Sequence, residues 1–436
     1  MCPVDVPALS PVVQRTVLPN GLTLIVQEVH TVPLVSAWCW YRVGSGDETP
    51  GLTGASHWVE HMNFKGTRHI PAAQMKGIIE RHGGSWNGYT WIDQTTYLAT
   101  AATRALPDIL SVEAERMEHG LYDPAECESE RTVIISELQG GENDPEQLLD
   151  LEVTATALRV HPYGHPVIGW LQDLESITRD DLYGHYRRYY APNNAVLVIV
   201  GDVDAAEVSR EVDRRFGRIQ PRAVDRPRRQ PEPPQIGERR VLIEREGTTA
   251  YLKLAYPSPA VSDPMFGPLL VLDAVLTGAK GVSLWSSFRG KAPQRKSLLY
   301  RALVDMGLAS SVSGALLPTR DPYLYTITAT AADGVPLEIV EDAALGAIDR
   351  VRSGVGDAEV ARAKRQLRAR MVFDADSVTN IAHQLGFFET IGAREVLDWL
   401  PASISRVTAA DVHEAAHRIL SPASLTLGAF EPRVPA

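Results

Sequence analysis

The hydrophobic pattern near the N-terminus is typical of antiparallel strands joined by tight turns. Two short apolar runs, residues 16–18 and 22–26, flank Pro19-Asn20-Gly21, and an Asn-Gly pair is a strong signal for a hairpin. Residues 34–43 form a further strand candidate, and residues 85–100 form another because they are rich in Tyr, Trp and Thr. We therefore predict a mostly antiparallel sheet in this part of the chain.

Helical segments alternate with these strands and continue beyond them. A helix is expected from about residue 72 to residue 82, where Gly83-Gly84 breaks it. Further helices are predicted at about residues 104–118, 124–158 and 179–190, and the apolar run at 195–200 has the length of a buried strand. A mixture of sheet and helices in this order predicts an α+β fold.

A proline- and arginine-rich tract, residues 221–237, is the clearest linker in the chain. The sequence on its far side resembles the first half, because residues 177–182 match residues 407–412, and Pro192 matches Pro422 (422 − 192 = 230). We predict two homologous domains, 1–220 and 238–436. Each is expected to be a mostly antiparallel sheet with helices packed on one face, and the two are expected to enclose a cleft.

The first domain contains the segment His57-Trp58-Val59-Glu60-His61, which reads H-x-x-E-H. It is the reverse of the H-E-x-x-H motif of zinc peptidases. In a helix, residues four apart share one face, so His57 and His61 could bind one Zn²⁺ while Glu60 borders that face. On these five residues alone, histidines with ordinary structural roles are an equally good interpretation.

A third ligand is needed for a zinc site, and the segment from Glu130 to Glu137 offers two carboxylates. The two glutamates are seven residues apart, which is two helical turns, so they share one face of a helix. One can bind a metal while the other orients a ligand histidine. The alternative is a solvated helix face.

This arrangement resembles the pitrilysin/insulinase superfamily of inverted-motif zinc metallopeptidases, which includes the mitochondrial processing peptidases and their bacterial relatives. The resemblance rests on H-x-x-E-H followed by Glu137 at 137 − 61 = 76 positions further, and on Glu130 seven residues earlier. It extends over nearly the whole chain, through residues 44–48, 61–67, 83–90, 161–166, 192–195 and 201–202. Asn63 departs from the pattern, since the family more often has an apolar residue there.

The resemblance implies a site with one Zn²⁺ per chain, held by His57, His61 and Glu137. Glu60 is then the general base that takes a proton from water, because it lies beside the ligands without being needed as one. Glu130 is expected to orient a ligand histidine. The corresponding helix of the second half, residues 268–276, contains neither His nor Glu, so we predict no second copy of this site.

The family also implies where substrate binds. Asn87, Gly88 and Tyr89 match the edge strand to which an extended peptide is thought to add by main-chain hydrogen bonds. The alternative is that Asn87-Gly88 is simply a turn.

A departure from the family concerns an Arg/Tyr pair that helps to bind substrate from the second domain. Leu303 stands at the Arg position and Ser310 at the Tyr position, while Arg301 is two residues away from the required place. We therefore hypothesise that this chain is the catalytic subunit of a heterodimer whose homologous partner supplies the pair. Compensation by Arg301 or another side chain is the alternative.

Composition limits the other functions. With 436 residues the chain is too long for one ordinary core, and its formal net charge of −11 disfavours nucleic acid and anionic membranes as partners. No apolar run reaches the ~18 residues of a membrane helix, and no signal peptide is visible. Three dispersed cysteines, Cys2, Cys39 and Cys127, suit a reducing compartment. We expect a cytoplasmic protein, or a periplasmic one from which a leader has been removed.

The leading interpretation is a zinc endopeptidase acting on short or unfolded peptides. One alternative is a non-catalytic peptide-binding or scaffold subunit of a processing-peptidase-like complex, although such a subunit has no need of His57, Glu60, His61 and Glu137 together. Another is a zinc hydrolase that acts on a non-peptide amide or ester.

Overall fold

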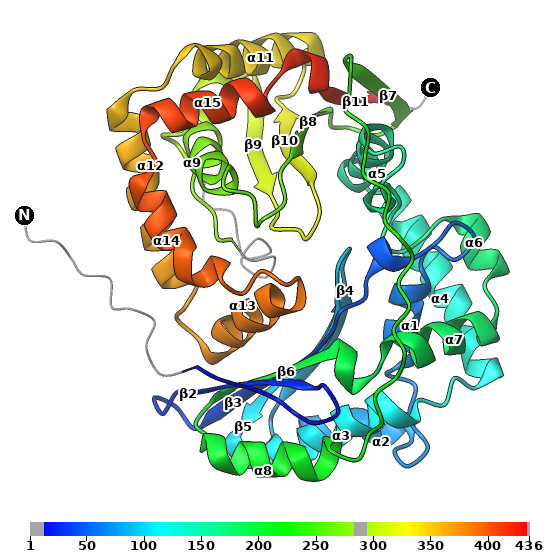
Figure 1. Ribbon diagram of the computed structural model, residues 1–436. Coiled ribbons are helices and arrows are strands. Elements are labelled where there is room, and N and C mark those ends of the chain that lie inside the picture. The colour runs from blue at the N-terminus through cyan, green and yellow to red at the C-terminus, as the bar shows by residue number, and fades with distance from the viewer. Residues whose placement is uncertain (1–12, 283–293, 434–436) are drawn as a thin grey trace, which may run out of the picture. The chain divides into compact units, whose positions relative to one another are not determined.

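A computed structural model describes residues 13–282 and 294–433 (Figure 1). The chain divides into two compact units, each built around one sheet. Unit 1 consists of Met1–Thr132, Gln172–Pro227 and Ala375–Thr390, and unit 2 consists of Val133–Leu171, Arg228–Asp374 and Ile391–Ala436. None of the described helices has the length and apolar character needed to cross a membrane.

The sheet of unit 1 has six strands in the order β1-β2-β6-β3-β5-β4. Their bounds are β1 Gln14–Val17, β2 Thr23–Glu28, β3 Leu34–Tyr41, β4 Ser85–Thr90, β5 Thr95–Ala102 and β6 Ala195–Gly201. All neighbouring pairs are antiparallel except β2 with β6, which is parallel. The predicted hairpin around Gly21 is present, and β4 lies at an edge of the sheet.

Helices cover both faces of this sheet. They are α1 Ala55–Met62, α2 Ala72–Glu80, α3 Leu106–His119, α6 Leu171–Ser176, α7 Arg179–Tyr189, α8 Ala205–Phe216 and α13 Val378–Thr390, together with the first part of α4 Pro124–Glu142. Strand residues alternate between the two faces. Helices α13 and α3 lie on opposite faces of the sheet (Figure 1). On β3, the Trp38 and Trp40 rings contact His383 of α13, whereas the Tyr41 ring lies against Tyr97 and Tyr190.

The sheet of unit 2 repeats this order with one strand fewer. Its strands are β7 Arg239–Glu246, β8 Tyr251–Ser258, β9 Ala309–Leu316, β10 Tyr323–Ala331 and β11 Thr426–Arg433, in the order β7-β11-β8-β10-β9. Only β7 with β11 is parallel. The helices are α5 Pro145–Ala157, α9 Phe266–Leu276, α11 Leu337–Ser353, α12 Asp357–Phe373, α14 Val396–Arg406 and α15 Ala409–Ile419.

The register of the strands confirms the internal repeat. In unit 1, Trp38 pairs with Val198 on one side and Leu98 on the other. In unit 2, Lys253 pairs with Gly428 on one side and Thr328 on the other. Gly428 lies 230 positions after Val198 (428 − 198), and Thr328 lies 230 positions after Leu98 (328 − 98). Helices α7 and α15 both begin with a capping box, formed by a Thr and an Asp three residues later. The α+β fold with two homologous sheet-plus-helix halves is thus confirmed.

One helix of each unit comes from the other half of the sequence, and it covers the face opposite to the remaining helices. Helix α13 packs on β3 and β6, and α5 packs on β7, β8 and β11. The contacts are close: a Cβ on Gly386 of α13 would lie 2.0 Å from Trp40 Nε1, and a Cβ on Gly428 of β11 would lie 2.2 Å from Val153 of α5. The domain boundaries 1–220 and 238–436 stay a prediction about where the repeats begin and end.

The tract predicted as a linker has no regular structure over residues 220–236, but it is fastened by polar contacts. Arg226 binds Asp47 of unit 1, and Arg229 binds Asp321 of unit 2. The Glu232 carboxylate accepts hydrogen bonds from three successive backbone N–H groups, those of residues 159–161, at 2.8–3.0 Å. The tract is therefore held at defined points rather than only by its ends.

Two of the three cysteines are described. Cys39 and Cys127 are buried and free, and burial raises the pKa of both thiols. Cys39 belongs to the core of the first sheet. Cys2 lies outside the described residues.

Candidate metal centre

The H-x-x-E-H segment lies in helix α1, which is the condition under which His57 and His61 share one face. Trp58, Val59 and Met62 are buried and anchor one side of the helix in the core. At the N-terminus, the buried Glu48 carboxylate accepts hydrogen bonds from the N–H groups of Gly54 (2.8 Å) and Ser56 (2.6 Å). A carboxylate at this end satisfies helix N–H groups that have no partner within the helix, and so fixes where α1 starts.

The two histidines of α1 project from one face, and a carboxylate of α4 reaches the same place. The His57 and His61 ring centroids are 4.5 Å apart. Together with Glu137 they offer three ligand atoms that all lie within 4.8 Å of one another. The structure thus brings together the three residues that the sequence analysis assigned as metal ligands, although Glu137 is 76 residues from His61.

Glu130 contacts one of the predicted ligand histidines directly. Its Oε1 is 2.8 Å from His61 Nδ1, and its Oε2 accepts a hydrogen bond from Lys65. Burial works against the charge of Glu130, but the hydrogen bonds from Lys65 and His61 outweigh it and lower the pKa of the carboxyl. A carboxylate kept ionised holds the proton of His61 on Nδ1, so a metal would be bound through Nε2.

Burial favours the neutral form of the His57 imidazole. Burial, and beside it the charge of His61, lowers the pKa of His57 to about 3. A neutral imidazole is the form that binds a metal. Two imidazoles and one carboxylate are donors that Zn²⁺ accepts in catalytic sites, and such sites keep a further position for water. The donor set of this chain therefore fits Zn²⁺.

Glu60 is buried on α1 and its carboxylate approaches strand β4. A Cβ on Gly88 would lie 2.8 Å from Glu60 Oε1 and 3.0 Å from the Phe64 ring. Any larger residue at position 88 would push into the carboxylate. The glycine thus allows the backbone of β4 to pass directly beside the predicted general base.

The three residues assigned to substrate binding all lie on β4 but differ in direction. Gly88 faces Glu60, while Asn87 is exposed and Tyr89 is half-buried. The Tyr89 hydroxyl lies 2.9 Å from His383 Nε2 on α13, which covers the other face of the sheet. Asn87 and Gly88 are strand residues paired with Leu98 and Tyr97, so they do not form a turn.

Several residues that support the site were missed by the sequence analysis. Arg131 lies over the Trp58 ring at 4.8 Å, which ties α4 to α1. Arg131 also donates to the Ile177 carbonyl at 2.9 Å. Lys65 follows His61 by four residues, so helical spacing could have suggested that Lys65 lies near His61. No local signal could have suggested Arg131, because its partners are 73 and 46 residues away (131 − 58 and 177 − 131).

Asn63, the departure from the family pattern, ends α1 in a buried polar network. Its Nδ2 donates to the Tyr97 hydroxyl at 2.8 Å, and its carbonyl accepts from Arg116 Nε at 3.1 Å. Arg116 is fully buried, pairs with Glu113 at 2.7 Å and lies over the Tyr97 ring at 4.1 Å. These contacts hold the C-terminal end of the helix that carries the histidines.

The second half keeps one carboxylate at the corresponding place. A Cβ on Gly314 of β9 would lie 2.6 Å from Asp273 Oδ1, just as a Cβ on Gly88 would meet Glu60. Asp273 is buried and is bound by Thr277, Lys280 and Tyr325. Helix α9 has neither His nor Glu, and in the described part of the second half no group of metal-binding side chains accompanies Asp273. Its carboxylate is neutralised by the lysine instead.

The residues at the predicted Arg/Tyr positions have ordinary roles. Leu303 is buried, and Ser310 is exposed on the edge strand β9. The Arg301 guanidinium lies 3.4 Å from Glu359 of α12. Compensation by Arg301 would require this pair to break.

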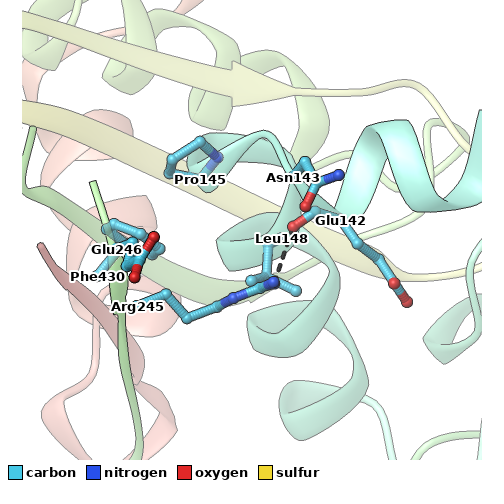
Figure 2. A pocket seen from close by; sticks show the side chains of 7 residues that line it. All are labelled: Glu142, Asn143, Pro145, Leu148, Arg245, Glu246 and Phe430. Carbon is cyan, nitrogen blue, oxygen red and sulfur yellow. Dashed lines mark hydrogen bonds between the residues drawn. The ribbon is translucent and has the colours of Figure 1, made fainter. Parts of the chain in front are cut away.

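A pocket of about 420 Å³ lies elsewhere in unit 2 (Figure 2). It is lined by Glu142, Asn143, Pro145, Leu148, Arg245, Glu246 and Phe430. Arg245 donates a hydrogen bond to the Glu142 carbonyl at 3.0 Å across it. None of the predicted ligands lines this pocket, and its residues form no catalytic arrangement.

Comparison with known proteins agrees with this geometry. Residues 23–170 match the family described as Insulinase (Peptidase family M16), and residues 176–367 match the Peptidase M16 inactive domain. An uncharacterized zinc protease of Streptomyces coelicolor is 28% identical over 423 residues, which cover 94% of this chain and 87% of that protein. The mitochondrial-processing peptidase subunit beta of Lentinula edodes is 25% identical over 427 residues, covering 97% and 90%.

A solved structure shares the fold. The crystal structure of a protease from Helicobacter pylori superposes with a TM-score of 0.90 at 23% identity, and the match covers 97% of this chain and 100% of that one. The two family matches follow each other along most of the chain, and the first includes the H-x-x-E-H segment and both glutamates. This chain belongs to the pitrilysin/insulinase superfamily, peptidase family M16.

Proposed function

We propose that this chain is a zinc-dependent endopeptidase that hydrolyses short or unfolded peptides, and that it is the catalytic subunit of a heterodimer. The observation that carries the proposal is the convergence of His57, His61 and Glu137 within 4.8 Å. Two relatives that match 94% and 95% of this chain are named zinc proteases, which supports the same activity.

Each residue has one task in this proposal. His57, His61 and Glu137 hold the ion, and Glu130 orients the His61 ring through Nδ1. Zn²⁺ bound there acts as a Lewis acid that lowers the pKa of a water molecule to about 7. Glu60 takes a proton from the attacking water and passes it to the amine that leaves. It is suited to this because it is on α1 between the two histidines and is not one of the converging ligands.

Strand β4 is the proposed substrate strand. It is an edge strand that pairs only with β5 among the described strands, so its outer N–H and C=O groups can pair with an extended peptide. Gly88 brings this edge next to Glu60. Recognition through the main chain rather than through side chains suits an enzyme that accepts varied unfolded peptides.

The test of the catalytic assignment is cleavage of a quenched fluorescent peptide library, with and without a zinc chelator. We expect chelation to stop cleavage and added Zn²⁺ to restore it. Glu60→Gln should lower kcat by at least about 100-fold, because a general base contributes that much, while zinc content by elemental analysis stays unchanged. Glu126→Gln, which changes an exposed glutamate of α4, is the matched control and should retain full activity.

Two outcomes would separate the alternatives. A chain that binds the library tightly but cleaves nothing, with zinc and its homologous partner chain both present, would be a non-catalytic peptide-binding subunit. A chain that cleaves only small esters or non-peptide amides would be a different zinc hydrolase. Cleavage by Glu60→Gln at the wild-type rate would remove Glu60 from its proposed role.

The heterodimer proposal rests on Leu303 and Ser310 and on similarity to proteins named as subunits. We expect a second, homologous chain without the histidine motif to co-purify with this one. Added in equal amount, it should raise kcat/KM for peptides. A purified monomer whose rate does not change on adding that chain would contradict the proposal.

A further inference from the structure

Outside the predicted zinc centre, a second group of metal-binding side chains lies in unit 1. His69, Glu115 and His119 each offer a ligand atom within 4.8 Å of the other two. Glu115 and His119 are four residues apart on α3 and therefore share a face, and His69 reaches them from the loop that follows α1. The group shares no residue with the predicted zinc centre.

The backbone around this group is held in place by hydrogen bonds of its own. The Arg68 N–H donates to the His119 carbonyl at 2.9 Å, and Thr67 pairs with Gly120 as a β-bridge. The Thr67 hydroxyl donates to Glu115 Oε2 at 3.0 Å. The loop and the end of α3 are thus joined directly by the two residues before His69, so binding an ion would require little additional ordering of the chain.

The side chains already point toward a common position. His69 Nδ1 lies 3.1 Å from each oxygen of Glu115, and the His69 and His119 ring centroids are 5.0 Å apart. Glu118 Oε2 is 3.5 Å from His119 Nε2 and adds a second negative charge. His69 is 58% exposed, so solvent ions can reach the group.

We propose that His69, Glu115 and His119 form a second, surface site for a divalent transition metal. Two imidazoles and one carboxylate suit Zn²⁺, Ni²⁺ or Cu²⁺, whereas Mg²⁺ and Ca²⁺ prefer all-oxygen ligands. Water fills the remaining positions, because three protein ligands do not complete the coordination of these ions. The C-terminal end of a helix favours positive charge, which adds to the attraction at His119.

A contact between His82 and Asp108 of the same helix α3 shows what a group without a second histidine looks like. His82 Nε2 lies 2.8 Å from Asp108 Oδ2 of α3, an ordinary histidine–carboxylate contact. No second histidine joins it among the described residues, so it belongs to no metal-binding group. His82 therefore provides a matched control for His69.

Metal at this site should also stabilise the fold. The ligands link the loop after α1 to the end of α3, and an ion that binds only the folded state raises the free energy of unfolding by mass action. Melting temperature therefore reports occupancy without any measurement of peptide cleavage. Because this measurement does not depend on peptide cleavage, a failure of the second metal site can be distinguished from a failure of the proposed enzyme activity.

The experiment is calorimetric titration of the metal-free full-length chain with Zn²⁺ and with Ni²⁺, followed by elemental analysis. We expect two ions per wild-type chain and one per His57→Ala/His61→Ala chain. In that double variant, adding His119→Ala or His69→Ala should weaken the remaining site by more than about 10-fold, since losing even a hydrogen-bond partner of a ligand costs that much. Adding His82→Ala should change nothing.

Comparison of metal-free melting curves shows whether each variant folds. His69 lies in an exposed loop, so His69→Ala keeps the test informative if His119→Ala destabilises α3. Absence of stoichiometric binding in the His57→Ala/His61→Ala chain would overturn the proposal. Equal losses in the His69→Ala and His82→Ala variants would overturn it as well, because they would indicate non-specific histidine binding.

Discussion

At the scale of single residues, buried carboxylates hold helix α1 at its start and along the face that carries His57 and His61. Glu48 accepts two N–H groups at the first turn, and Glu130 holds His61 through Nδ1. Lys65 supplies the positive charge that offsets the burial of Glu130. The position of His61, a predicted metal ligand, thus depends on a chain of contacts from Lys65 through Glu130 to His61.

Glu130→Gln tests this chain. The amide keeps the shape of the side chain but removes its charge, so it accepts the His61 N–H less strongly and no longer offsets Lys65. We expect zinc affinity to fall by about 10- to 100-fold. Competition with a chelator of known affinity measures the change.

The control for Glu130→Gln is Glu126→Gln, one turn earlier on α4 at an exposed position. It should leave zinc affinity unchanged. If Glu130→Gln also binds zinc with wild-type affinity, the 2.8 Å contact to His61 is not a determinant of the site.

At the scale of secondary-structure elements, the close packing of α13 on the first sheet depends on Gly386. Trp40 is fully buried and stacks on Trp38, so it has no room to move away from an added methyl group. The second sheet is approached by α5 in the same way at Gly428. In both units, a glycine marks the place where a distant part of the chain packs on the sheet.

Gly386→Ala should destabilise the protein by about 1–3 kcal/mol, the usual cost of overpacking a core. Gly346→Ala is the matched control, because Gly346 lies within α11 and a Cβ there would meet nothing within 4 Å. That change should be neutral or stabilise by up to about 1 kcal/mol, as alanine favours a helix over glycine. Denaturant unfolding measures both, and equal effects would refute the packing argument.

Glu232 in the linker leads to a prediction about how the stability of the protein depends on pH. Burial raises the pKa of Glu232, but the N–H groups of His161, Arg159 and Val160 outweigh it and hold the pKa below its ordinary value of 4.5. A carboxyl with a lowered pKa in the folded state stabilises the protein above its unfolded pKa, and that stabilisation is lost as the pH falls through the folded pKa.

Glu232→Gln should therefore lower the melting temperature at pH 7, and the difference from wild type should shrink as the pH falls below about 4.5. Scanning calorimetry at pH 7 and at pH 4 checks this. A difference that grows in acid would show that the sign is wrong. Glu238→Gln, on a more exposed glutamate close by, should show a smaller effect at pH 7.

At the scale of the whole molecule, neither half of the sequence contains all of its own compact unit. Residues 1–220 include the first sheet but not α13, and residues 238–436 include the second sheet but not α5. The Trp38 and Trp40 rings pack on His383 of α13, so without α13 these rings would face water. Exposed aromatic surface of this kind promotes aggregation.

We expect the fragment 1–220 to be insoluble or molten when it is expressed alone, and the fragment 1–237 to behave in the same way because it also lacks α13. Co-expression of 1–237 with 238–436 should recover folded protein, since every helix is then present. Near-ultraviolet circular dichroism and solubility report the outcome. A fragment 1–220 with cooperative thermal unfolding would contradict the prediction.

The sequence by itself determined whatever depends on short spacing or on repetition. Helical geometry places His57, Glu60 and His61 together without reference to the rest of the chain, and it places Glu130 and Glu137 on one face of α4. The 230-residue repeat likewise predicted two similar sheets, because equal patterns of apolar residues favour equal folds.

Only the tertiary structure decided which of these faces meet. Local periodicity says which side of a helix is apolar, but the partner of that side is chosen by packing between distant segments. The meeting of α1 with α4, the support from Arg131, and the placing of α13 and α5 are therefore absent from the local pattern. His69 joins Glu115 and His119 for the same reason: hydrogen bonds between a loop and a helix end bring it to a pair of helix residues to which no spacing relates it.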